Sequence, residues 1–189
     1  MYFTSSRGPR AFAMLSECVN FKKKRMASQE AIAVQAFGKK ALKTILVTGL
    51  IVGALDGLAA VLLTYGLYDR PPFAVFKYIA SGLLGQSAFS GGPLTIILGI
   101  SCHFFIALMW TFALFFLHPT ISAVLRNKVT KSIFYGSVIW IVMNLVVLPL
   151  SRVPGGTIGI NQVITGVSIL IVAAGVPLAI SFDRYFFRK

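Results

Sequence analysis

Three polar side chains stand inside long hydrophobic stretches of this 189-residue sequence, namely Asp56, His103 and Asn144. A carboxylate near the centre of a membrane helix costs about 2.5 to 3.5 kcal/mol even on insertion-based scales, so Asp56 must be protonated or partnered. The three residues lie at similar depths in three different stretches, which allows them to share one polar layer. We therefore predict a midplane cluster that combines a carboxyl, an imidazole and a carboxamide group.

Three kinds of chemistry are open to this predicted cluster. Hydrogen bonds between the helices would fix their register, and each such bond contributes about 0.6 kcal/mol on average. An acid beside an imidazole can instead hold and release a proton, as a proton-coupled carrier requires. His103 could also ligate a cofactor, but its neighbour Cys102 points about 100 degrees away on a helix. The sequence therefore predicts no metal site, and we expect no cofactor.

Four hydrophobic stretches must position these residues: 45–67, 94–117, 132–151 and 162–182. A hydrocarbon core about 30 Å thick needs about 20 apolar residues in a helix, so each stretch is long enough to cross a bilayer. The composition agrees, with 57% hydrophobic and 12% charged residues and a mean hydropathy of +0.82. Continuous runs of this length exclude an ordinary soluble domain, and the sequence predicts an all-α membrane protein with four transmembrane helices.

Positive charge is concentrated in the segments on one side of these four spans. Among the 18 Lys and Arg residues, the only ones on the other side are Arg70, Lys77 and Arg152. Cytoplasmic segments retain such an excess, so both termini are predicted to be cytoplasmic. The +13 net charge then suits contact with the lipid bilayer rather than with nucleic acid, for which no folded basic domain is present. The candidate headgroup contacts are Lys39, Lys40, Lys43, Arg126, Lys128 and Lys131.

Two segments outside the spans have interpretations of their own. Residues 1–27 are predicted to be a basic cytoplasmic arm, which is either a disordered extension or a mis-called start that precedes true initiation at Met26. Residues 28–189 are predicted to form the transmembrane domain. Between the first two spans, residues 73–89 repeat apolar side chains at helical spacing between proline and glycine boundaries. This pattern predicts an extra helix on the outer face, either lying in the interface or re-entering the membrane.

The first span also carries a stripe of small residues. Gly49, Gly53 and Gly57 repeat every four residues, and Ala60 falls on the same helix face. Small residues let another helix backbone approach closely, so we predict a helix-packing face that can dock another helix within a homo-oligomer or a larger membrane complex. Near the ends of the third and fourth spans, a proline in each predicts a kink.

Several short strings follow one another in order: Gly49-Leu50-Ile51-Val52-Gly53, Gly99 with His103, Tyr135-Gly136, Asn144, and Leu148-Pro149-Leu150. Together they resemble the YagU-type family of uncharacterised bacterial inner-membrane proteins. The resemblance covers residues 49–150 and implies a small helical bundle in the bacterial cytoplasmic membrane. It implies no reaction and no ligand.

The function predicted from these features is not enzymatic. The sequence contains no Ser/His/Asp order, no paired carboxylates, no metal-ligand spacing and no phosphate-binding glycine loop. The preferred interpretation is a structural or binding subunit whose midplane polar layer fixes helix packing in an oligomer or complex. The alternative is a small proton-coupled carrier or pore that uses Asp56 and His103.

Overall fold

The computed structural model describes residues 38–67, 69–155 and 159–187, together with Asn20, Phe21, Lys24 and Ser28. The chain divides into two units, Met1–Ala41 and Leu42–Lys189, and the contacts described below lie within the second. The basic arm predicted for residues 1–27 falls almost entirely outside the described residues. In the segment that precedes the first predicted span, the structure describes Ser28 and residues 38–44.

Among the described residues every regular element is helical, and four helices are long and apolar enough to cross a membrane. These four are α2 (Lys39–Gly66), α5 (Pro93–Val124), a third helix at Lys128–Leu150 and a fourth at Ile160–Phe187. The prediction of an all-helical chain with four candidate membrane spans is confirmed. Each helix begins or ends four or more residues outside its predicted span, at the end where the basic residues gather. Polar residues continue a helix past the hydrocarbon core, whereas hydrophobicity alone marks only the core.

Two π-helical turns interrupt the third and fourth long helices. The third runs from α6 (Lys128–Val142) through η1 (Met143–Val147) to α7 (Leu148–Leu150), and the fourth from α8 (Ile160–Leu170) through η2 (Ile171–Gly175) to α9 (Val176–Phe187). Pro149 and Pro177 each follow two residues after a π turn. A proline ring clashes with the carbonyl four residues earlier, so the backbone widens ahead of it, and these turns are the distortions expected from the two prolines.

Two short helices, not one, occupy the segment between the first two long helices. They are α3 (Ala74–Leu84) and the single turn α4 (Ser87–Ser90), whereas the sequence predicted one helix over residues 73–89. Gly85 separates them because its φ of +64° lies in the left-handed region, which side chains disfavour. The correction is thus local: the chain is helical here, but a glycine breaks the predicted helix four residues before its end.

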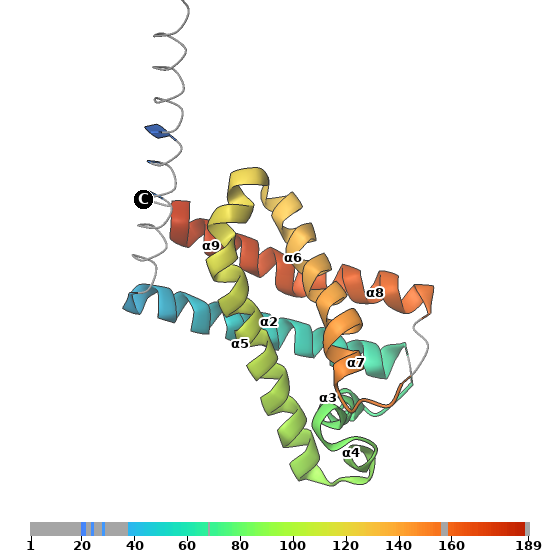
Figure 1. Cartoon of the computed structure of the whole chain (residues 1–189). Coiled ribbons are helices and arrows are strands. Elements are labelled where there is room, and N and C mark those ends of the chain that lie inside the picture. The colour runs from blue at the N-terminus through green and yellow to red at the C-terminus, as the bar shows by residue number, and fades with distance from the viewer. Residues whose placement is uncertain are drawn as a thin grey trace, which may run out of the picture. The chain divides into compact units, whose positions relative to one another are not determined.

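The helix α3 packs directly against α5, as Figure 1 shows. Gly99 of α5 permits the close approach, because a Cβ atom at this position would overlap the backbone of Phe76 in α3. Phe76 and Ala80 are buried on the side that faces protein. Protein contacts along one face therefore hold α3 in place.

The glycine stripe of α2 also faces α5. Side chains of α5 occupy the space where Cβ atoms of the three glycines would lie, with Leu108 2.6 Å from that of Gly49, Phe104 2.8 Å from that of Gly53 and His103 3.1 Å from that of Gly57. Ala60, on the same face, is half-buried. The stripe therefore packs against a helix of its own chain.

The buried core lies where α5, α6 and α9 meet. Its largest fully buried side chains include Phe115, Tyr135 and Phe182. Elsewhere the long helices are covered by little protein, since only 17% to 33% of the most apolar stretch of each is buried. Apolar surface of this extent is unfavourable in water but matches lipid tails or a further protein surface.

Candidate functional site

The predicted midplane residues are divided between two places, and the first joins α2 to α5. The Nε2 atom of His103 lies 2.8 Å from the backbone carbonyl oxygen of Gly53. A carbonyl can only accept, so Nε2 carries a hydrogen and donates it. Asp56 is the residue before Gly57, where an added Cβ atom would lie 3.1 Å from this imidazole, and both side chains are half-buried. Among the described residues no hydrogen bond or ion pair joins Asp56 to His103, so the acid and the imidazole are neighbours on two helices without a direct contact.

Asn144 does not join this pair. Its side-chain amide donates to the carbonyl oxygen of Trp140 on the same helix at 2.9 Å. It also lines a separate cavity of about 730 Å³ that borders α3 and the start of α8. Among the described residues no hydrogen bond links Asn144 to Asp56 or His103. The predicted three-membered layer is corrected to a pair, because similar depth in the membrane does not ensure that the helix faces meet.

The most extensive polar contacts lie at the other end of the core, near the basic ends of the helices. The Nδ1 atom of His118 (α5) is 2.6 Å from the hydroxyl of Tyr135 (α6), and its Nε2 atom is 3.2 Å from Oδ1 of Asp183 (α9). The ammonium of Lys131 (α6) pairs with the same carboxylate oxygen. We call these four residues the buried network, and it connects three of the four long helices.

One protonation state satisfies every member of the buried network. With its hydrogen on Nε2, a neutral His118 donates to the carboxylate of Asp183 and accepts at Nδ1 from the Tyr135 hydroxyl. Ser122 adds a hydroxyl 3.1 Å from Nε2. The positive Lys131 then balances the negative Asp183, so the network carries no net charge. A buried ion pair needs this full hydrogen bonding to offset its desolvation.

Burial and aromatic rings shield most of the network from solvent. His118 and Tyr135 are 0% exposed, and Lys131 is 3% exposed. The ring of Phe186 stacks on the imidazole with centroids 5.3 Å apart, and Phe182 meets it edge-on at 5.4 Å. Apolar rings around an ion pair strengthen its electrostatic attraction, because they keep out water that would screen it.

Local sequence explains how these residues reach one level. The helix α5 does not end at Pro119 but continues to Val124, which carries His118 beyond the predicted span as part of a regular helix. At the start of α6, Asn127 caps the helix by accepting from the backbone N–H of Val129 at 3.0 Å. Lys131 follows in the first turn and so faces α9.

The prediction that six basic residues contact lipid headgroups is corrected for Lys131. Its ammonium is buried against Asp183 and does not reach the surface. The other five side chains, Lys39, Lys40, Lys43, Arg126 and Lys128, are exposed. Sequence reasoning counted Lys131 with them because a lysine next to a span usually extends to the interface.

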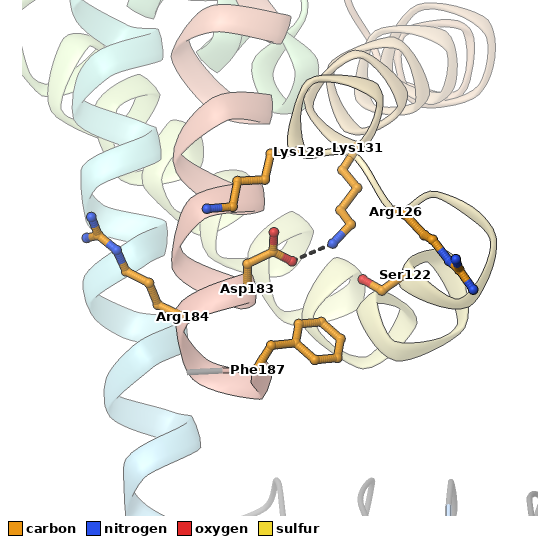
Figure 2. Close-up of a pocket in the computed structure, with 7 residues that line it drawn as sticks. All are labelled: Ser122, Arg126, Lys128, Lys131, Asp183, Arg184 and Phe187. Atoms are coloured by element: carbon orange, nitrogen blue, oxygen red, sulfur yellow. Dashed lines mark hydrogen bonds and ion pairs between the residues drawn. The ribbon is translucent and has the colours of Figure 1, made fainter. Parts of the chain in front are cut away.

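An open pocket of about 430 Å³ adjoins the buried network, and Figure 2 shows its side chains. Four basic residues line it: Arg126, Lys128, Lys131 and Arg184. Asp183 is the one carboxylate among the residues that line the pocket, and it forms an ion pair with Lys131. The pocket therefore carries an excess of positive charge.

The described residues include no group of three His, Cys, Asp or Glu side chains that could hold a metal ion. No family model matches the chain, and no curated protein or solved structure is significantly similar to it. The resemblance to the YagU-type family therefore gains no support from these comparisons. What the chain does must be inferred from the contacts of its own residues.

Replacing Tyr135 with Phe should lower the free energy of unfolding by about 1 to 3 kcal/mol. The change removes only a hydroxyl, but it leaves the buried Nδ1 atom of His118 without a donor. Equilibrium unfolding of the purified protein in mild detergent measures the loss. Tyr65→Phe is the control, because Tyr65 is 66% exposed. Equal stability of the two variants would contradict a structural role for the Tyr135 hydroxyl.

Proposed function

We propose that this protein is a structural or binding subunit of the bacterial cytoplasmic membrane, where it works within a homo-oligomer or a larger complex. Its four long apolar helices support a multi-pass arrangement. The excess of basic residues at one end of them supports an orientation with both termini in the cytoplasm. In that orientation α3 and α4 lie on the outer side.

One observation carries this proposal: among the described residues, every buried side-chain nitrogen and oxygen already has a hydrogen-bond partner within the chain. A carrier needs polar groups that are free to bind and release its cargo. Here the buried groups are bonded within the chain instead, some to their own helix and some to another helix. Interhelical polar bonds of this kind stabilise a membrane bundle because lipid offers no competing partners.

The polar contacts form a continuous series of links between the long helices. His103 links α5 to the backbone of α2 at Gly53. His118 then links α5 to α6 through Tyr135. Lys131 and Asp183 link α6 to α9. Each long helix is thus joined by at least one polar contact to another, as expected for a subunit that must keep a fixed shape.

The wide apolar surface suits a partner subunit as well as lipid. Exposed side chains such as Leu58, Leu62 and Phe105 point away from the core of the single chain. Because the glycine stripe is already covered by α5, an oligomer would form through these larger apolar side chains. Association would then depend on their shape rather than on close backbone approach.

A second candidate function, a small proton-coupled carrier or pore, is favoured by the pairing of Asp56 with His103. A half-buried acid beside the imidazole of the adjacent helix forms a place where a proton can be exchanged. A carrier would need Asp56 to be ionisable, whereas a structural subunit needs only its polar contacts.

Replacing Asp56 with Asn separates the two functions. For a structural subunit we expect a loss of about 0.6 to 1.7 kcal/mol in stability, the range for polar contacts between membrane helices, and no proton flux in either protein. Liposomes containing a pH-sensitive dye measure the flux, and melting in detergent measures stability. Asp69→Asn is the control, because Asp69 is exposed and Asn also tolerates its positive φ. Proton flux in the wild type that Asp56→Asn abolishes would establish the carrier and reject the subunit.

A further inference from the structure

The pocket beside the buried network contains cations that no carboxylate neutralises. Among the described residues, no Asp or Glu oxygen lies within 4.0 Å of the side-chain nitrogens of Arg126, Lys128 or Arg184. The pocket is open, and all three side chains are exposed. They come from the loop after α5, from the start of α6 and from α9, so three separate parts of the chain line one pocket, with the guanidinium groups of Arg126 and Arg184 at its opposite sides (Figure 2).

The fourth cation of the pocket, Lys131, is itself held in place. Lys131 is held by Asp183 and lies over the ring of Phe187, 5.4 Å from its centroid. Because the pair cancels its own charge, the surplus in the pocket is that of the three unpaired cations. A ligand with a single charged oxygen would neutralise only part of that positive charge. A phosphate group offers several acceptor oxygens, and the planar guanidinium of arginine matches them two at a time.

The surroundings of the pocket favour a ligand that is partly apolar. Phe187 in its wall is 62% exposed, and the nearby Val124 and Val129 are 79% and 63% exposed. These side chains lie at the ends of long apolar helices, next to their exposed apolar surface. A phospholipid in the adjoining leaflet would place its phosphate at this level and its acyl chains against that surface. Basic pockets between membrane helices on the cytoplasmic side commonly bind anionic headgroups in this way.

We propose that this pocket binds a phosphate group, and that an anionic phospholipid supplies it. Binding would hold the ends of α5, α6 and α9 together through one ligand. The inference goes beyond the proposed function, because it names a ligand class and a site that a purely structural subunit does not need. Phosphate from a soluble compound has the same chemistry, and the test below distinguishes the two sources.

The test compares the wild type with the combined variant Arg126→Gln, Lys128→Gln and Arg184→Gln. Native mass spectrometry in neutral detergent, with short-chain phosphatidylglycerol as the probe, gives the half-saturating lipid concentration. Each removed cation should raise that concentration about fivefold, and all three should raise it about a hundredfold. The matched control is Arg152→Gln, which removes an exposed cation outside the pocket and should bind as the wild type does. An equal half-saturating concentration in the wild type and the combined variant would overturn the proposal.

Melting in nanodiscs identifies the source of the phosphate. Phosphatidylglycerol in a phosphatidylcholine disc should raise the melting temperature of the wild type and of Arg152→Gln, but not that of the combined variant. A saturable rise with inorganic phosphate in pure phosphatidylcholine discs, also lost in the combined variant, would overturn the lipid as source. If the combined variant does not fold, the three single variants replace it, since each changes one exposed side chain. A rise shared equally by all variants reflects general charge screening and would reject the site.

Discussion

Replacing Asp183 with Asn is expected to cost about 3 kcal/mol of stability, the largest effect of any single change of a polar residue in this chain. The substitution preserves the size of the side chain but removes its negative charge. Lys131, which is 3% exposed, is then left as a buried cation without a counter-charge. The value lies at the lower end of the range for broken buried ion pairs, since Asp183 borders an open pocket that admits some water. Denaturant unfolding in detergent, followed by circular dichroism, measures the loss.

A double variant tests the physical reason. Lys131→Met alone should also be destabilising, because it leaves the Asp183 carboxylate without its cation, but combining it with Asp183→Asn should recover part of the loss. Asp69→Asn serves as the control for removal of an exposed carboxylate. If the loss of stability in the double variant equals the sum of the losses in the two single variants, the two side chains do not interact, which would contradict this reason.

Replacing Gly136 or Gly175 with Ala is expected to cost about 1 to 3 kcal/mol at each position through overpacking. A Cβ atom on Gly136 of α6 would overlap the backbone of Ile171, and one on Gly175 of η2 would overlap the backbone carbonyl of Ser132. Backbone cannot rotate away as a flexible side chain can, so α6 would have to separate from the fourth long helix. The same interface carries Lys131 and Asp183, and its separation would weaken that ion pair as well.

The matched control for this prediction is Gly66→Ala. Gly66 is the last residue of α2, and a Cβ atom there meets nothing within 4 Å. Alanine has the higher helix propensity, so this variant should be as stable as the wild type or slightly more stable. Melting of the three variants under one detergent condition makes the comparison. Equal melting temperatures for Gly136→Ala, Gly175→Ala and Gly66→Ala would contradict the close backbone contact between the two helices.

Glycines also illustrate what a sequence pattern can and cannot predict. The helical spacing of Gly49, Gly53 and Gly57 predicted a helix-packing face, and these three glycines do face another helix. Their neighbours on α5 are side chains. Gly136 and Gly175 belong to no repeat, yet each faces the backbone of a neighbouring helix. An added Cβ atom is therefore tolerated less well at these two positions than in the α2 stripe. A periodic pattern reveals which face of a helix is small, but not which partner lies opposite it.

The buried network was missed for a different reason. His118 and Lys131 lie outside the residues predicted to span, and Asp183 follows one residue after the fourth predicted span. Residues at such positions are usually solvated, so no pairing among these three was predicted. One signal was available: this chain has only 2 His and 5 acidic residues, and one of each falls at the same predicted edge as a lysine. Scarce titratable groups at one level are candidates for pairing.

Two properties of the sequence alone, the length of its hydrophobic stretches and the distribution of its charges, determined the four long helices and the end at which basic residues gather. They are local properties, since a helix satisfies its own backbone and lipid selects for apolar length. The tertiary structure alone decided which polar faces meet: Asp56 with His103, Asn144 apart from both, and His118 with Asp183. Those pairings depend on the order, rotation and separation of neighbouring helices, which arise from packing across the whole bundle and leave no mark in any one segment.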